Sequence, residues 1–228
     1  MKAKSSALFF ALVLVPALVL GQPDSPAAFP VCLGGSSSKT PFHPSEHTDC
    51  DGDPLDQANN KIIKEDEELL GISPRDVRFI GCAAAPFLTV PGSGLIRSQA
   101  TIYYPTGSKF KPDYYAAPLL HELGHVFQLK QAGSYTRLRA SLEDSNERIE
   151  LGADFIAGLA ANKLGLKPAD FLINLALIGS YNIQDQDFHG TPANRTQAFR
   201  NGYFYDDGGQ IADSYADFQD NLFGHIKN

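Results

Sequence analysis

The pattern of apolar and polar residues divides the chain into a short part that contains strands and a longer helical part. Apolar residues at helical spacing predict helices near Asp56–Leu70, Asp113–Gln131, Ser145–Leu164, Pro168–Ile178 and Ile211–His225. Thr191–Pro192 predicts the start of another helix, because Thr is a favoured N-cap and Pro is favoured at the first helical position. β-Branched and aromatic residues predict strands at Asp76–Cys82 and Ser98–Tyr104. The predicted class is α+β, mostly helical, with a small β-sheet before the main helices.

The helix predicted over Ser145–Leu164 has signals at both ends. Asp144 and Glu147 have the spacing of a capping box at its start, and Gly165 is expected to end it. Small residues line the middle of this segment, among them Ala153. We therefore expect the helix that carries Gly124 to approach it closely.

Residues 1–21 have the pattern of a secretory signal peptide. Lys2 and Lys4 precede an apolar run, Ala7–Leu20, that is short for a bilayer span, and Gly21 suits cleavage at that point. The alternative is an uncleaved N-terminal anchor. No other segment is long and apolar enough to cross a membrane. We expect a mature chain without a membrane span, secreted or located in a periplasmic or extracellular space.

Composition and cysteine count extend this interpretation. Residues 22–55 are rich in Pro, Ser, Gly and Asp without periodicity and predict an irregular arm, whereas residues 56–228 predict one domain. In an oxidising compartment two of the three cysteines can pair, and the sequence leaves open which two of Cys32, Cys50 and Cys82 do so. The 228 residues carry a net charge of −7 with no basic stripe, so no nucleic-acid partner is expected.

The strongest chemical signal is the segment H-E-L-G-H at residues 121–125. Residues four apart lie on one face of a helix, so His121 and His125 can bind one metal ion, and imidazole nitrogens suit Zn²⁺. Glu122 lies about 100° around the helix from His121, so it can flank the metal and accept a proton from water. The alternative is a pair of ordinary histidines on a helix.

A catalytic zinc ion needs a third protein ligand. Glu150 and Asp154 lie one turn apart, so Glu150 can bind the metal while Asp154 accepts the outer N–H of a ligating histidine. Glu147 is the competing ligand, but the residue one turn after it is Leu151, and we favour Glu150. The alternative for the Glu150–Asp154 pair is a solvated polar face, against which the apolar neighbours argue.

His189 and Arg195 belong to the segment that begins the next predicted helix. A histidine at a loop–helix junction beside a metal can donate a hydrogen bond to a developing oxyanion. Arg195 can pair with a buried carboxylate, and Asp154 is the candidate. The alternative is that His189 is only a polar residue at a helix cap.

Three motifs in order resemble those of the bacterial neutral zinc metallopeptidases. These are H-E-L-G-H, E-L-G-A-D-F-I-A-G at residues 150–158, and H-G-T-P-x-x-R-x-x-x-F-x-x-G-Y at residues 189–203. That family belongs to the gluzincins, and its motifs are related to the HtpX-type and CAAX prenyl protease group. The resemblance covers residues 95–205 or so and implies a zincin-like domain without the transmembrane helices of the HtpX-type enzymes.

The resemblance also implies roles for these residues. His121, His125 and Glu150 would bind zinc, and Glu122 would act as the general base. Asp154 would lie behind the ligands, while His189 and Arg195 would support the transition state or the structure of the site.

A peptide or protein substrate is expected to add to Ser98–Tyr104, taken as an edge strand. Tyr103 and Tyr104 point to opposite faces, so only one of them would reach the substrate, and Tyr203 is a further candidate to hold the oxyanion. Alternatively, this strand is only core structure.

A different functional class is a catalytically inactive extracellular zinc-binding or interaction protein. Glu122 favours the enzyme, because metal binding alone does not need a base.

Overall fold

A computed structural model describes the chain from the first predicted helix to the last. The described residues are 50, 57–83, 85, 87–92, 100–106, 116–177, 189–205 and 209–224, with the backbone alone at 57–59, 173–177 and 222–224. The predicted signal peptide lies outside the described residues, as does the predicted arm apart from Cys50.

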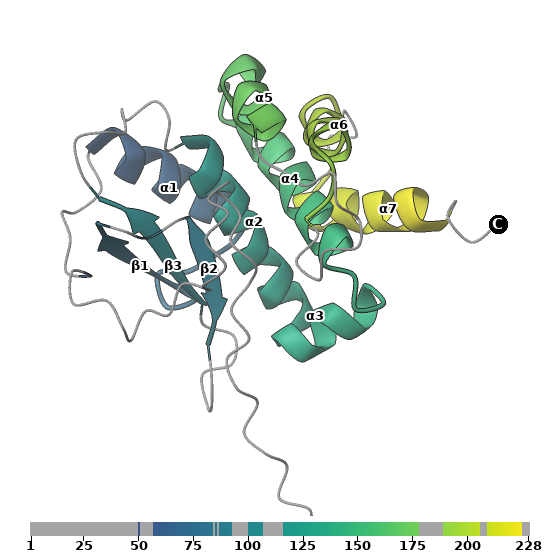
Figure 1. Cartoon of the computed structure of the whole chain (residues 1–228), viewed down its shortest axis with the longest axis horizontal. Helices are drawn as coiled ribbons and strands as arrows, with labels where there is room; N and C mark the ends of the chain where they lie inside the picture. Colours follow the sequence, from purple (N-terminus) through teal and green to yellow (C-terminus); the bar gives the residue numbers. More distant parts are fainter. Residues whose placement is uncertain are drawn as a thin grey trace, which may run out of the picture.

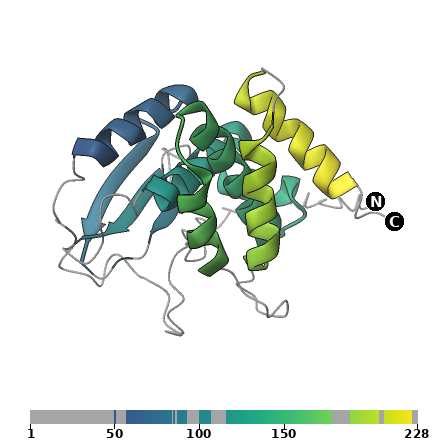
Figure 2. The same cartoon turned by 90° about the horizontal axis from the view of Figure 1, so that it is seen from above.

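The fold is α+β and mostly helical, with a small sheet that precedes most of the helices. The strands are β1 (Val77–Cys82), β2 (Leu88–Pro91) and β3 (Ala100–Pro105), and the helices are α1 (Gln57–Leu69), α2 (Ala116–Ala132), α3 (Tyr135–Ser141), α4 (Asn146–Lys163), α5 (Pro168–Leu177), α6 (Pro192–Tyr203) and α7 (Ile211–Gly224). α2 lies between the sheet and the later helices, and α4 packs against α2, α6 and α7 (Figures 1 and 2). The predicted class is confirmed.

The sheet corrects one prediction, because β3 is its central strand and not an edge. The strand order is β1-β3-β2, with β1 parallel and β2 antiparallel to β3. Ile102 of β3 therefore has Phe79 on one side and Thr89 on the other. β2, which was not predicted, is four residues long and ends at a proline, so its sequence carries little alternation. In the described part of the chain, β2 is an edge strand.

The helix boundaries confirm most of the predicted signals. Thr191 caps α6 by accepting a hydrogen bond from the Asn194 N–H, and Gly165 follows α4 with a φ of +67°. The predicted cap of α4 at Asp144 is wrong. Ser145 is the N-cap and accepts from the Arg148 N–H, because Asp144 has a φ of +57° and pairs with Arg139 instead. α3 was not predicted.

Close helix contacts place α4 at the centre of the helical part. A Cβ atom on Gly124 would lie 2.9 Å from the main-chain oxygen of Ala153, so α2 and α4 meet backbone to backbone. On the other side of α4, a Cβ atom on Gly158 would clash with the main-chain oxygen of Phe199 in α6. The predicted close approach of α2 and α4 is thus confirmed, and α6 packs equally closely against another side of α4.

Two further findings concern cysteines and membranes. A disulfide joins Cys50 to Cys82 at the end of β1, while Cys32 lies outside the described residues. Within the described ranges, no helix combines the length and apolar character that a membrane crossing requires.

Candidate metal centre

Three metal-ligating side chains from two helices meet in the interior. His121 and His125 project from α2, and their rings lie edge to face with centroids 4.7 Å apart. Glu150 comes from α4, and its carboxylate oxygens lie 3.3 Å from Nε2 of His121 and 3.4 Å from Nε2 of His125. One ligand atom from each of the three residues lies within 4.8 Å of the others, and all three are buried. The close approach at Gly124 is what brings Glu150 to the two histidines.

Asp154 and Arg195 determine how His121 is oriented. Oδ1 of Asp154 lies 2.8 Å from Nδ1 of His121, so Nδ1–H donates to the carboxylate and Nε2 points toward Glu150. Arg195 from α6 donates to both oxygens of Asp154, over 2.7 and 2.9 Å. The expected pairings of Asp154 with a histidine and with Arg195 are both present. Nη2 of Arg195 also lies 3.6 Å from Oε2 of Glu150.

His125 is oriented by a second network, which the sequence analysis missed. Nδ1 of His125 lies 3.0 Å from Oε1 of Gln128, whose Nε2 donates to the main-chain oxygen of Ile149 and to the hydroxyl of Tyr215 on α7. Because Nε2 has two acceptors, the amide orientation is fixed and Oε1 must accept from His125. The proton of this hydrogen bond therefore sits on Nδ1 of His125, and Nε2 points toward Glu150. Gly152 makes room, since a Cβ there would overlap the Gln128 amide.

Both histidines thus present Nε2 to the same region as the Glu150 carboxylate. The charges around them shift the pKa values of this cluster. Burial alone lowers the pKa of His121, but the carboxylates of Asp154 and Glu150 outweigh it and raise that pKa to about 9. Burial raises the pKa of Glu150, whereas His125 and His189 lower it more, and the net pKa lies well below the usual range. The carboxylates of this cluster therefore stay ionised at neutral pH.

Glu122 follows His121 on α2 and is fully buried, with one carboxylate oxygen hydrogen-bonded and the other without a partner among the described residues. Oε2 accepts a 2.6 Å hydrogen bond from the hydroxyl of Thr89 on β2. Oε1 is buried and has no hydrogen-bond partner among the described residues. An unsatisfied buried oxygen costs about 1–3 kcal/mol, so such a group calls for a ligand or a catalytic role.

His189 precedes α6 and reaches the same carboxylate as the other two histidines. Its Nδ1 lies 3.5 Å from Oε1 of Glu150, and its side chain is 14% exposed. Glu147, the competing third ligand, is turned elsewhere, because its Oε1 accepts from the Asn194 amide. The structure therefore brings together His121, His125, Glu150, Asp154, His189 and Arg195, and Glu122 is the residue that follows His121 on α2.

The three predicted substrate-binding tyrosines are not gathered at this cluster. Tyr104 is buried in the core at 5% exposure, and Tyr103 points to the other face of β3. Tyr203 lies at the far end of α6, where its hydroxyl donates to the main-chain oxygen of Leu166 and its ring stacks on Phe199.

Of the residues that sequence reasoning missed, only Gln128 carried a local signal, since it follows His125 by one helical turn. Thr89 and Tyr215 approach the site through the tertiary fold, and no sequence pattern connects them to it.

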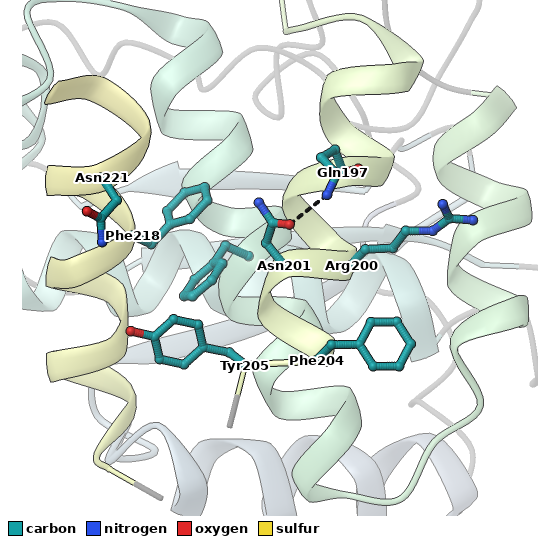
Figure 3. A pocket seen from close by; sticks show the side chains of 8 residues that line it. Gln197, Arg200, Asn201, Phe204, Tyr205, Phe218 and Asn221 are labelled. Atoms are coloured by element: carbon teal, nitrogen blue, oxygen red, sulfur yellow. Dashed lines mark hydrogen bonds between the residues drawn. The ribbon is translucent and has the colours of Figure 1, made fainter. Parts of the chain in front are cut away.

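A shallow groove of about 700 Å³ between α6 and α7 contains none of the metal-cluster residues; it is lined by Phe155, Gln197, Arg200, Asn201, Phe204, Tyr205, Phe218 and Asn221 (Figure 3).

Comparison with known proteins does not identify the chain. No protein-family model, curated protein or solved structure matches it. The function therefore has to be inferred from the side chains. Two imidazoles and one carboxylate are a ligand set that can hold a metal ion, and the residue after His121 is a buried glutamate with one oxygen unpartnered among the described residues.

Proposed function

We propose that this protein is a zinc-dependent peptidase in which Glu122 acts as the general base. The observation that carries the proposal is the buried group of His121, His125 and Glu150, with the free Oε1 of Glu122 on the next residue of the same helix. A structural metal site needs the ligands but has no use for a further carboxylate with a buried, unpartnered oxygen.

The protein's own groups divide the chemistry among them. Nε2 of His121, Nε2 of His125 and the Glu150 carboxylate would hold the zinc ion, which supplies Lewis acidity toward water and the substrate carbonyl. Asp154 and Gln128 keep the protons of the two imidazoles on Nδ1, so that both Nε2 atoms remain ligands.

Glu122 moves the proton in the proposed reaction. Its Oε1 accepts a proton from the attacking water and passes it to the amine that leaves when the peptide bond breaks. Because Oε1 is buried and unpartnered in the described structure, no other hydrogen bond has to be broken first.

His189 is the proposed donor to the oxyanion of the tetrahedral intermediate. It lies at the rim of the cluster, partly exposed, where a substrate carbonyl would approach. Arg195 supports the site through Asp154. Its Nε and Nη2 atoms donate to the two oxygens of Asp154, so it holds that carboxylate against His121.

The corrected sheet moves the proposed substrate strand. β2 is one of the two described edge strands and carries Thr89, which touches Glu122, whereas β3 has a neighbour on each side. An extended peptide would therefore pair with β2 rather than with β3. The leader pattern at residues 1–21 and the Cys50–Cys82 disulfide support secretion as part of the proposal.

The test is digestion of a diverse peptide library by the mature protein, read by mass spectrometry, with zinc and with a chelator. Glu122→Gln should bind zinc and cut nothing. Glu147→Gln, on the surface of α4, is the matched control and should cut as the wild type does. Zinc-dependent cleavage that is absent only from Glu122→Gln supports the peptidase. Zinc binding without any cleavage by the wild type would refute it and leave a zinc-binding protein.

A further inference from the structure

The Thr89 hydroxyl makes the one described side-chain hydrogen bond to Glu122, and neither the ligand set nor the base explains it. Oγ1 of Thr89 lies 2.6 Å from Oε2 of Glu122 and 3.2 Å from the Glu122 main-chain oxygen. A hydroxyl has one proton to donate, and 2.5–2.7 Å is the usual length of an O–H···O⁻ bond. The proton therefore lies on the bond to the carboxylate.

Thr89 is itself held rigidly. Its main chain lies in β2 opposite Ile102, and both side chains are fully buried. Thr is β-branched, so its χ1 angle is restricted, and its hydroxyl has little freedom to leave this direction. The hydroxyl is thus a fixed donor anchored on the sheet, while the carboxylate that it binds is anchored on α2.

The two oxygens of Glu122 consequently differ. Oε2 is tied to Thr89, and Oε1 is buried without a partner in the described part of the chain. Without the tie, the carboxylate could rotate about its terminal torsion, which has broad minima, and neither oxygen would have a defined position.

We propose that Thr89 is a positioning residue for the general base: its hydroxyl fixes Oε2 of Glu122 so that Oε1 is the oxygen that accepts the proton. This inference rests on the proposed peptidase function. It adds a residue of the edge strand to the catalytic machinery and makes the placement of the base depend on the packing of β2 against α2.

The test compares Thr89→Val, which has nearly the same shape but no hydroxyl, with Thr89→Ser, which restores the hydroxyl. Thr101→Val, on β3 of the same sheet, is the matched control because Thr101 is half-buried and lies on another strand. All are loaded with zinc and assayed with a fluorogenic peptide built on a bond that the wild type cuts. Zinc content and thermal unfolding are measured in parallel.

We expect Thr89→Val to lower kcat about 10- to 100-fold, the size of effect that a misplaced catalytic group produces, with KM and zinc content within about twofold of the wild type. Thr89→Ser should recover kcat to within about threefold, and Thr101→Val should leave it unchanged. If Thr89→Val does not fold, Thr89→Ala takes its place with the same expected loss.

Three results would overturn the inference. An active Thr89→Val refutes the positioning role and leaves the peptidase intact. A loss of kcat that parallels a loss of zinc, or that Thr89→Ser fails to recover, assigns Thr89 a structural role only. A wild type that binds zinc but cleaves no peptide refutes the proposed function itself, and the role of Thr89 falls with it.

Discussion

Replacement of Gln128 by leucine tests whether the second network orients His125 for metal binding. In the wild type, Oε1 of Gln128 accepts from Nδ1 of His125, and Nε2 of Gln128 donates to Ile149 and Tyr215. A leucine side chain at this position would offer neither the acceptor nor the donors. The buried Nδ1–H of His125 would lose its acceptor, and the ring could carry its proton on Nε2 instead, where it blocks the metal.

The expected loss of zinc affinity follows from the loss of the outer hydrogen-bond partner of His125. Outer partners of metal-bound histidines typically contribute 10- to 100-fold to metal affinity, or about 1.4–2.7 kcal/mol. Tyr215 keeps its bond from Gln219, so the fold itself should lose about 1–2 kcal/mol from the unpaired N–H. We therefore expect the free energy of zinc binding to weaken by more than the free energy of unfolding of the metal-free protein does.

The assay is competition for zinc against a chromophoric chelator, with urea unfolding of the metal-free protein beside it. Gln128→Glu keeps an acceptor for His125 but loses the donors, so its affinity should stay close to that of the wild type. Gln219→Leu removes only the outermost bond and should bind zinc normally. If Gln128→Leu binds zinc as tightly as the wild type, the network does not orient His125 and the reasoning is wrong.

Two further predictions concern stability. Asp66 is buried without a partner for either oxygen among the described residues, and burial, reinforced by Glu67, raises its pKa. The contribution of Asp66 to the free energy of unfolding should therefore fall as the pH rises above about 4. Asp66→Asn should flatten that slope and add about 1–3 kcal/mol at neutral pH, and parallel urea-unfolding profiles for the two proteins would contradict this. Gly124→Ala should push α2 from Ala153, cost about 1–3 kcal/mol and weaken zinc binding. Gly71→Ala, whose Cβ meets no atom within 4 Å, should lose stability through its φ of +62° but bind zinc normally in the same competition assay.

The candidate site was predictable wherever its geometry is local. His121 and His125 share a helix face, and Glu150 and Asp154 share another, because the helical repeat alone fixes those relations. Gln128 obeys the same rule and could have been found. The pairing of Arg195 with Asp154 was predicted from charge complementarity in a buried setting.

The features that the sequence did not predict mostly depend on contacts between parts of the chain that lie far apart in the sequence. Strand order depends on which segments meet in three dimensions, so the composition of the β3 segment could not reveal that it lies between two neighbours. Thr89 reaches Glu122 across 33 residues and Tyr215 reaches Gln128 across 87, and neither pair has a sequence signature. The cap of α4 was misplaced by one residue because Asp and Ser are both good caps, and only the backbone angles separate them.

The burial of Arg195 among carboxylates has a consequence for the charge of the guest ion. Arg195 pairs with Asp154 and approaches Glu150, and Glu122 is buried on α2 beside His121 in the sequence. The formal charges of these four buried groups leave two negative charges uncompensated. A divalent cation restores electroneutrality there, whereas a monovalent ion leaves an excess and a trivalent ion overshoots. Without a cation, protons have to supply the balance, as the raised pKa of His121 indicates. In the proposed metal site, a doubly charged ion would therefore displace protons on binding, and charge would contribute to ion selectivity in addition to ligand geometry.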